Sequence, residues 1–414
     1  MKDKEFVWLP YTQMKNNISQ LEVVKTDGCK IFLKDGRVLI DGIASWWSVA
    51  HGYNNPYITK KIKEQLEILP HVMLAGLSNE TTYNLAKRLA QITNLNHVFF
   101  SDSGSTAIEV AMKICWQYFI NTKKPIKNKF VSFKNSYHGD TSGAMSLADN
   151  SDSMHQKFSD ILIKNFNLEM PQSNDDLNKF EEFIKLHHYE ICGLFIEPLV
   201  QCAGGMKFNK PEILKNIYDI CQKYEIIFVA DECAVGFYRT GTRFACDHAK
   251  ITPDIMVLGK ALTGGFMTLA ATITNNKIFE AFLGNSLDQA LMHGPTFMGN
   301  ALSCAAASAS LDLFEKNNYE LQVANYKKYF HENLKQFLEY KSVTAVREIG
   351  AIGVIQTNFN RDKIVNFRKK IVEYNVFLRP FSNIVYIMPS LTISFNELDI
   401  IISGIKKVFD EIDE

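Results

Sequence analysis

The feature that most constrains the fold is a series of short apolar runs separated by stretches with helical periodicity. Five runs are apolar along most of their length: 97–100, 129–133, 191–196, 226–230 and 254–258. Runs of this kind are typical of strands buried on both faces. The first connecting stretch carries an apolar stripe at helical spacing, formed by Ala107, Val110, Ala111, Ile114, Cys115 and Tyr118. The alternation predicts an α/β fold with a mostly parallel central sheet and helices on both faces.

The rest of the chain predicts a second, smaller unit. Residues 21–45 alternate apolar and polar side chains around turn signals at Asp27-Gly28 and Asp35-Gly36, which predicts a small antiparallel ribbon. A chain of 414 residues is long enough for two or more structural units. We expect an N-terminal segment that contributes to the small domain and to the site (1–54), a large domain (55–309) and a C-terminal small α+β domain (310–414).

Composition excludes several classes of function. Lys plus Arg and Asp plus Glu are 45 each, so the formal net charge of zero gives no electrostatic case for nucleic acid or an anionic membrane. The N-terminus lacks the apolar core of a secretory signal, so we expect a cytoplasmic protein. The 8 cysteines are scattered without a C-x-x-C pair, which favours buried thiols over disulfides or a zinc site. We expect no metal.

Polar groups follow all five apolar runs. Open α/β sheets bind ligands at the carboxyl ends of their strands, so five independent loops point to one site. These groups are Ser101–Thr106, the sequence KNSYHGD at 134–140, Glu197-Pro198, Asp231-Glu232 and Gly259-Lys260.

The turn Ser103-Gly104-Ser105 joins the first strand to the first helix of this series. The first amides of a helix lack internal partners and the helix dipole favours an anion there, which indicates a phosphate site. Ordinary N-capping by serine is the alternative. The turn lacks the lysine of a P-loop, so a nucleoside triphosphate is not expected.

A lysine, a carboxylate and a phosphate site at one sheet edge meet the requirements of pyridoxal phosphate. Lys260 can hold the cofactor aldehyde as a Schiff base, and a carboxylate can keep the pyridine nitrogen protonated. Asp231 suits the second role, because a buried carboxylate needs a partner. Two alternatives stay open: Lys260 as a strand cap that points to water, and Asp231 as a helix N-cap.

The residues around Asp231 and Lys260 carry a family resemblance. The segments VADECAVGFYRTG (229–241) and PDIMVLGKALTGG (253–265) resemble the class III aminotransferases of PLP fold type I. Four further segments resemble the branch of this family that acts in biotin biosynthesis: LPYTQM (9–14), DGIASWWSVAHGYNNP (41–56), SYHGDTSGAMSL (136–147) and HGPTFMGNALSCAAA (293–307).

The resemblance implies a set of cofactor contacts. Lys260 would carry the cofactor and shuttle a proton, Asp231 would bind the pyridine nitrogen, and Tyr137 would stack on the ring. Thr296 would reach the phosphate of the partner subunit's cofactor, so a homodimer with shared active sites is expected. The implied catalytic residues are Lys260, Asp231, Tyr137 and Tyr11. The implied cofactor-binding residues are Ser103, Gly104, Ser105, Tyr137, His138, Glu197, Asp231, Lys260, Pro295 and Thr296.

The resemblance also implies a substrate pocket. Its aromatic walls would suit an aliphatic chain and a sulfonium cation, and Arg379 would pair with a substrate carboxylate. Trp46 and Trp47 as plain core aromatics, and Arg379 as half of a surface ion pair, are the alternatives. The implied substrate-binding residues are Tyr11, Trp46, Trp47, Tyr137, Asp140, Arg239, Lys260, Gly294, Arg379 and Tyr386.

The activity that the resemblance implies is a ping-pong transamination. S-adenosylmethionine would donate an amino group to the cofactor, and 8-amino-7-oxononanoate would receive it to give 7,8-diaminononanoate. Three alternatives stay open: an aminotransferase for ω-amino acids, another pyridoxal phosphate chemistry on this scaffold, and a non-catalytic scaffold. The identity of the amino donor also stays open, because some relatives use lysine.

Overall fold

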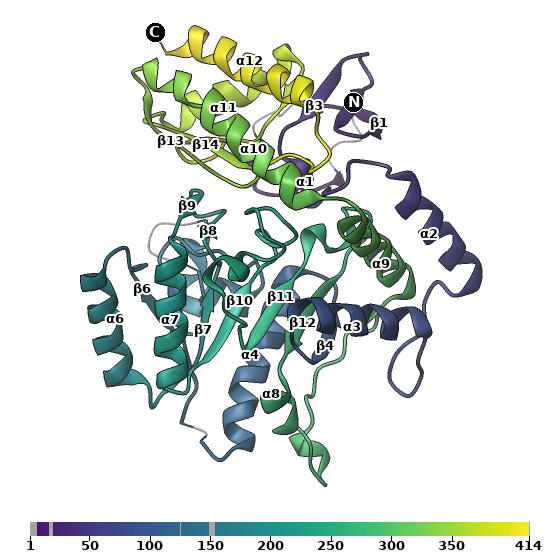
Figure 1. Cartoon of the computed structure of the whole chain (residues 1–414), viewed down its shortest axis with the longest axis vertical. Helices are drawn as coiled ribbons and strands as arrows, with labels where there is room; N and C mark the ends of the chain where they lie inside the picture. Colours follow the sequence, from purple (N-terminus) through teal and green to yellow (C-terminus); the bar gives the residue numbers. More distant parts are fainter. Residues whose placement is uncertain (1–5, 16–19, 125, 149–153, 414) are drawn as a thin grey trace.

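A seven-stranded sheet forms the centre of the lower part of the molecule in Figure 1. The computed structural model describes residues 6–15, 20–124, 126–148 and 154–413. In spatial order the strands are β4 (His97–Ser101), β12 (Ala270–Thr274), β11 (Ile255–Leu258), β10 (Ile227–Asp231), β7 (Ile191–Ile196), β5 (Lys129–Phe133) and β6 (Phe166–Leu168). The five predicted strands are therefore confirmed, each to within a residue or so at its ends.

Strand β12 makes the sheet mixed rather than wholly parallel. It pairs antiparallel with both β11 and β4, whereas β11, β10, β7, β5 and β6 pair in parallel. Only residues 259–269 separate β11 from β12, which is too short for a helical crossover, so the chain doubles back. The mostly parallel sheet predicted from the apolar runs is confirmed, with this one reversal.

Helices bury both faces of the sheet, which explains why the strands are apolar at every position. Phe195, Val229 and Val257 pack with α4 (Gly104–Asn121) in one cluster of buried side chains. The intervening Phe228 and Met256 belong to the cluster on the other face. Helices α6 (Asn174–His187) and α7 (Pro211–Lys223) pack on that other face and lie side by side in Figure 1. The predicted stripe on α4 is buried except for the half-buried Tyr118.

The N-terminal strands and the C-terminal elements both lie in the upper part of Figure 1. The predicted ribbon is present as β1 (Val23–Asp27), β2 (Lys30–Leu33) and β3 (Val38–Asp41), which pair antiparallel. Strand β15 (Val376–Phe377), from the C-terminal region, extends this sheet by pairing in parallel with β3. The N-terminal ribbon and the C-terminal region therefore share one sheet, while the expected domain boundaries stay a prediction.

The remaining C-terminal elements form a mixed layer of helix and strand. Strands β13 (Val343–Ile349), β14 (Ile352–Thr357) and β16 (Ile384–Ile387) make an antiparallel sheet, packed with α10 (Tyr319–Asn333). The other elements are α1 (Ala44–Trp47), α2 (Pro56–Ile68), α3 (Glu80–Thr93), α5 (Ser142–Ser146), β8 (Val200–Gln201), β9 (Lys207–Phe208), α8 (Asn276–Glu280), α9 (Ala301–Lys316), α11 (Arg361–Lys370) and α12 (Phe395–Ile412). Within the described residues, no helix is both long and apolar enough to cross a membrane.

Candidate active site

The loops that follow the parallel strands meet at one edge of the sheet. The amide of Asp140, after β5, donates to Ser105 Oγ at the start of α4 over 3.2 Å. The amide of Tyr137 donates to Glu197 Oε1, after β7, over 3.0 Å. His138 Nδ1 lies 2.8 Å from Asp231 Oδ2, at the end of β10. Four of the five strand-end loops expected to share a site are therefore joined by hydrogen bonds.

Asp231 is the buried anion at the centre of this edge. Its Oδ1 accepts the amide of Cys233 over 3.1 Å, and its Oδ2 is paired with His138. Burial alone would raise the pKa of this carboxyl, but the hydrogen bond with His138 and the nearby positive charges, including Lys260, outweigh it and lower the pKa. Asp231 is therefore ionised at neutral pH and can hold a cationic ring nitrogen.

Glu197 lies beside this pair but behaves differently. Its two carboxyl oxygens accept the amides of Tyr137 and Cys202, each over 3.0 Å. Burial raises its pKa to about 7, and the negative charge of Asp231 adds to the rise. Near neutral pH this group therefore exchanges between the neutral and the ionised form.

Lys260 begins the short 3-10 turn that follows β11. Its backbone adopts a left-handed conformation with φ 42°, which is uncommon for a residue other than glycine. Its side chain is half-buried, and Nζ lies 5.3 Å from the centre of the Trp47 ring. No hydrogen bond or ion pair engages this amine within the described part of the chain. The alternative of a lysine that points to water does not fit this placement.

The N-terminus of α4 offers backbone donors. Ser103 forms a capping box with Thr106, so the N-capping alternative holds for the Ser103 hydroxyl. The amides of Gly104 and Ser105 make no hydrogen bond with described residues. Gly139, at φ 125°, comes so close to Ser105 that a Cβ there would collide with the serine side chain. Because the loop after β5 packs this closely on the first turn of α4, that turn lies beside the strand-end groups.

The residues at this edge fit pyridoxal phosphate on three independent counts. An amine without a partner among the described residues matches the aldehyde, and a buried, ionised carboxylate matches the pyridine nitrogen. Unpaired amides at the start of an 18-residue helix match the phosphate. His138 Nε2, which is buried without a described partner, adds a further polar atom that a ligand could satisfy.

A hydrogen-bonded cluster joins the N-terminal segment to the loop after β5. The hydroxyl of Tyr11 donates to Asp140 Oδ2 over 2.5 Å and lies 3.2 Å from the hydroxyl of Tyr137. Burial, followed by the hydrogen bond to Asp140, raises the pKa of Tyr11, and burial also raises the pKa of Tyr137. On its other side Asp140 Oδ1 pairs with His155 Nε2 at 2.9 Å. Sequence reasoning does not find His155, because it lies outside every recognisable motif.

Trp46 and Trp47 face different partners. Trp46 is 40 % exposed and lies edge-on to Tyr11, with the Arg379 guanidinium 5.1 Å from the centre of its ring. Trp47 is buried, edge-on to Tyr386 and next to the Lys260 amine. Trp47 belongs to the buried core, as the alternative of core aromatics expects, but its ring also faces the Lys260 amine. Trp46 is too exposed for that alternative. Arg379 makes no ion pair with a described acidic residue, contrary to the surface-pair alternative.

Arg239 is placed behind the pocket rather than in its wall. Its side chain is fully buried, with Nη2 donating to the carbonyl of Trp47 over 3.3 Å and Nη1 donating to the carbonyl of Pro389. Burial lowers its pKa to about 10. The structure thus brings Arg239 to Trp47 but gives it no open face, and its contact with substrate stays a prediction.

The segment Gly294-Pro295-Thr296 is separate from the other predicted site residues. Gly294 and Thr296 are exposed, and no hydrogen bond between described residues ties them to the strand-end groups. This placement suits the expectation that Thr296 serves a second subunit, which stays a prediction.

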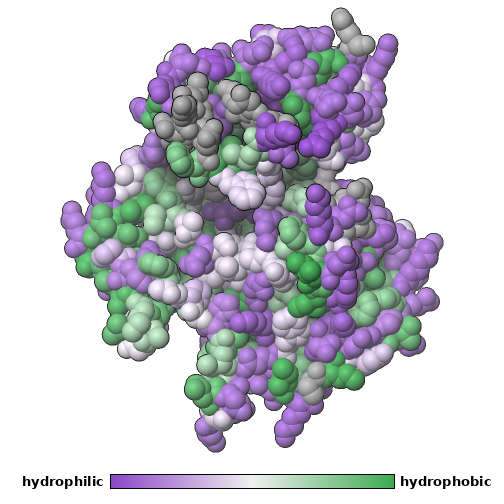
Figure 2. All heavy atoms as spheres, turned by 180° about the vertical axis from the view of Figure 1, so that it is seen from behind, coloured by the Kyte–Doolittle hydropathy of each residue, from purple (hydrophilic) through white to green (hydrophobic). Residues whose placement is uncertain are grey.

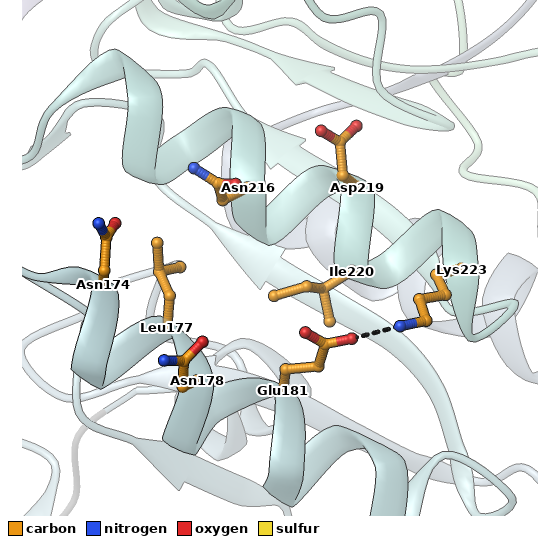
Figure 3. A pocket seen from close by; sticks show the side chains of 8 residues that line it. All are labelled: Asn174, Leu177, Asn178, Glu181, Asn216, Asp219, Ile220 and Lys223. Carbon is orange, nitrogen blue, oxygen red and sulfur yellow. Dashed lines mark hydrogen bonds and ion pairs between the residues drawn. The ribbon is translucent and has the colours of Figure 1, made fainter.

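A groove between α6 and α7 is a separate feature (Figure 3). It is lined by Asn174, Leu177, Asn178, Glu181, Asn216, Asp219, Ile220 and Lys223. Lys223 and Glu181 pair across it at 2.7 Å. These helices cover the sheet away from its carboxyl edge, and none of the strand-end groups lines the groove. We therefore assign the site to the strand ends.

Comparison with known proteins shows that the chain is similar to aminotransferases. The chain is 40 % identical over 417 residues to the adenosylmethionine-8-amino-7-oxononanoate aminotransferase of Buchnera aphidicola subsp. Schizaphis graminum, covering 99 % of this chain and 96 % of the relative. It superposes with TM-score 0.93 on the enzyme of that name from Methanocaldococcus jannaschii, at 32 % identity over 100 % and 98 % of the two chains. An amine transaminase from an uncultivated Pseudomonas species, solved with PLP bound, gives TM-score 0.92 at 26 % identity over 98 % of each chain.

The expectations of PLP fold type I and of an aminotransferase that uses pyridoxal phosphate are confirmed by these matches. The Aminotransferase class-III family matches residues 11–409, nearly the whole chain. The chain belongs to the class-III aminotransferase family.

Proposed function

We propose that the chain transfers an amino group from S-adenosylmethionine to 8-amino-7-oxononanoate in biotin biosynthesis. The observation that carries the reaction type is the position of the Lys260 amine, which has no hydrogen bond or ion pair among the described residues, at the same sheet edge as the ionised Asp231. The substrates are supported by two relatives of that name, at 40 % and 32 % identity over nearly the full chain.

The chemical step divides between few residues. Pyridoxal phosphate, when bound, supplies a sink for the electrons left when a substrate C–H bond breaks. Asp231 would hold the ring nitrogen, with His138 fixing the carboxylate by the 2.8 Å contact. Gly104 and Ser105 amides would bind the phosphate. Lys260 Nζ would take a proton from the substrate carbon and deliver it to the cofactor's aldehyde carbon within the same half-reaction, and the second half-reaction would run this transfer backwards.

The substrate contacts follow from the aromatic side of the site. Arg379 would pair with the carboxylate of 8-amino-7-oxononanoate, and Trp46 with Tyr11 would flank its aliphatic chain. The faces of the same rings would attract the sulfonium of S-adenosylmethionine. Asp140 would hold the Tyr11 hydroxyl toward the pocket through the 2.5 Å hydrogen bond.

We also propose a homodimer with shared sites, in the cytoplasm. Exposed apolar side chains lie on the segment that carries Thr296 and on residues 68–77: Ile68, Met73, Leu77, Met292 and Phe297. Residues 68–77 and the segment that carries Thr296 are in contact through the His71 and Phe297 rings, whose centres are 4.5 Å apart. An exposed apolar surface of this kind favours association. Figure 2 shows apolar patches and a recess on the face opposite to Figure 1. All 8 cysteines are free and buried, which suits a reducing compartment.

A transaminase for ω-amines is the second candidate, because the fold matches such enzymes closely. Their identity to this chain is 25–26 %, against 32–40 % for enzymes named for 8-amino-7-oxononanoate. The test is a product assay on the purified, cofactor-loaded protein. With 8-amino-7-oxononanoate as acceptor, S-adenosylmethionine, lysine and an ω-amine are offered in turn, and 7,8-diaminononanoate is measured by mass spectrometry. Product from S-adenosylmethionine is expected, and product from none of them would refute the proposal.

A further inference from the structure

The tryptophan pair lies on a backbone turn of the disfavoured hand. Four consecutive residues have positive φ: Ala44 at 47°, Ser45 at 46°, Trp46 at 54° and Trp47 at 73°. None is glycine, and for L-residues each left-handed position is costly. The turn closes through hydrogen bonds from the amides of Trp47 and Ser48 to the carbonyls of Ile43 and Ala44, over 2.8 and 2.9 Å. Such a conformation persists only where surrounding groups hold it.

Asp41 holds the start of this turn. The residue ends β3, is 2 % exposed, and accepts the amides of Ile43 and Ser45, each over 2.9 Å. The hydroxyl of Tyr53 donates to Asp41 Oδ2 over 2.7 Å and lies 2.5 Å from Ser45 Oγ. Three donors, two from the turn and one from Tyr53 in the segment that follows it, therefore converge on one buried carboxylate, where hydrogen bonds to charge are strongest.

Arg239 holds the end of the turn from the opposite side. Its Nη2 donates to the carbonyl of Trp47, and its other contact is the carbonyl of Pro389. The buried Asp41 carboxylate thus accepts hydrogen bonds from amides of the turn, and the buried Arg239 guanidinium donates to the carbonyl of Trp47.

These hydrogen bonds determine the direction of the two indole rings. Trp47 is directed to the Lys260 amine, 5.3 Å from its ring centre. Trp46 is directed to the Arg379 guanidinium, 5.1 Å from its ring centre, and to Tyr11. In a right-handed turn the same side chains would take other directions, because the backbone hand sets where each Cβ points.

We propose that Asp41 is a positioning residue that sets substrate affinity by holding the left-handed turn of residues 43–48. The inference rests on the proposed function, in which Trp46 and Trp47 wall the substrate pocket. Among the described residues, Asp41 makes no hydrogen bond or ion pair with either indole ring or with Lys260, so its effect would pass through the backbone of the turn.

The test compares Asp41→Asn with the double variant Asp41→Asn/Ala44→Gly. In Asp41→Asn the KM for 8-amino-7-oxononanoate should rise about tenfold, with kcat changing less than about threefold and the absorbance of the lysine-bound cofactor unchanged. Glycine at position 44 adopts positive φ freely, so the double variant should recover most of the affinity. Asp27→Asn, at an exposed position of strand β1 in the same sheet, is the matched control and should behave as wild type.

Hydrogen exchange gives a readout that needs no substrate. In the cofactor-loaded protein the amides of residues 43–48 should exchange about tenfold faster in Asp41→Asn, with Ala44→Gly restoring part of the protection. If Asp41→Asn does not fold, Tyr53→Phe removes one of the three donors and should give the same changes at about threefold. Unchanged KM and unchanged exchange would overturn the inference, as would a tenfold loss that Ala44→Gly does not rescue. Absence of turnover in wild type would instead refute the proposed function and leave the exchange result to decide on Asp41.

Discussion

The cofactor side and the substrate side of the site are built in opposite ways. On the cofactor side, His138, Glu197 and Asp231 are each at most 6 % exposed and are hydrogen-bonded to neighbouring strand-end loops. On the substrate side, Tyr11 is 56 % and Trp46 is 40 % exposed, and their partners come from segments far apart in the chain. The sheet thus fixes the groups that need one geometry, while chain segments outside it supply specificity.

The difference implies that variants on the two sides fail in different ways. A change at the sheet edge should remove chemistry for every substrate, because those groups serve the cofactor. A change on the aromatic side should alter the affinity for one substrate and leave the cofactor spectrum intact. Variants on each side therefore test this comparison separately.

The largest effect is expected from Lys260→Ala. Removal of the only amine placed beside Trp47 among the described residues should lower kcat at least about a hundred-thousandfold for any donor. The absorbance band of the lysine-bound cofactor should also disappear. Steady-state rates and an absorbance spectrum check this, with Lys63→Ala, on the exposed face of α2, as the matched control. A Lys260→Ala enzyme with measurable multiple turnover would break the account of the cofactor side.

Asp231→Asn should cause the second-largest loss of activity. The amide cannot carry the charge that keeps a pyridine nitrogen protonated, so kcat should fall about a thousandfold with both half-reactions affected alike. Stopped-flow measurement of each half-reaction checks this expectation. Asp219→Asn, in the groove between α6 and α7, is the matched control and should leave both rates unchanged. A loss confined to one substrate would show that Asp231 does not serve the cofactor.

Glu197 tests what burial costs on the cofactor side. Its pKa rises from 4.5 to about 7 on folding, so the folded state binds the extra proton between these values. The stabilisation is present below about pH 4.5 and is lost as pH rises to about 7, a change of about 3 kcal/mol. The melting temperature of wild type should therefore fall over this range.

Glu197→Gln should reduce the fall of the melting temperature with rising pH, because glutamine has no proton to lose. Part should remain, since burial also raises the pKa of Glu232 to about 7. Calorimetry of the cofactor-loaded protein at several pH values between about 5 and 7.5 checks both statements. Equal slopes in wild type and variant would contradict the assignment of a raised pKa to Glu197.

Arg379→Ala should give the smallest effect and the sharpest contrast. Loss of the guanidinium over Trp46 should raise the KM for 8-amino-7-oxononanoate about thirtyfold, with the half-reaction of the donor altered less than about threefold. Arg361→Ala, an exposed arginine on α11, is the control. If both substrates lost affinity equally, the aromatic side would not hold the carboxylate of the acceptor in the way proposed.

The cofactor side is predictable from sequence because it follows from strands that are apolar throughout. Each strand ends in a polar group, and the parallel arrangement forces those ends together, so the sequence alone brings Asp231 and Lys260 to one sheet edge. The antiparallel strand β12 is missed in this way, because its sequence AATIT is not an apolar run and is not recognised as a strand. The N-cap alternative for Ser103 also holds for its hydroxyl, because the capping box uses the same residue type as a phosphate turn.

The substrate side is less predictable because its geometry depends on long-range contacts. The motif around Trp46 and Trp47 indicates aromatic walls, but nothing in the residues Ala44 to Trp47 signals a left-handed turn. The buried Asp41 that holds this turn carries no signal beyond the motif to which it belongs. The resemblance places Arg239 in the pocket wall; in the structure its Nη1 and Nη2 donate to backbone carbonyls, while its Nε is buried without a described partner. Local sequence patterns cannot show whether a buried arginine lines the pocket or lies behind the residues that line it.

The most direct test of the central claim is a half-reaction on the cofactor-loaded protein, followed by absorbance. S-adenosylmethionine alone should remove the band of the lysine-bound cofactor, and later addition of 8-amino-7-oxononanoate should restore it. Lysine alone in place of S-adenosylmethionine should leave the band unchanged; a response to lysine only would keep the acceptor and replace the donor. No response to either donor would contradict the assignment to biotin biosynthesis.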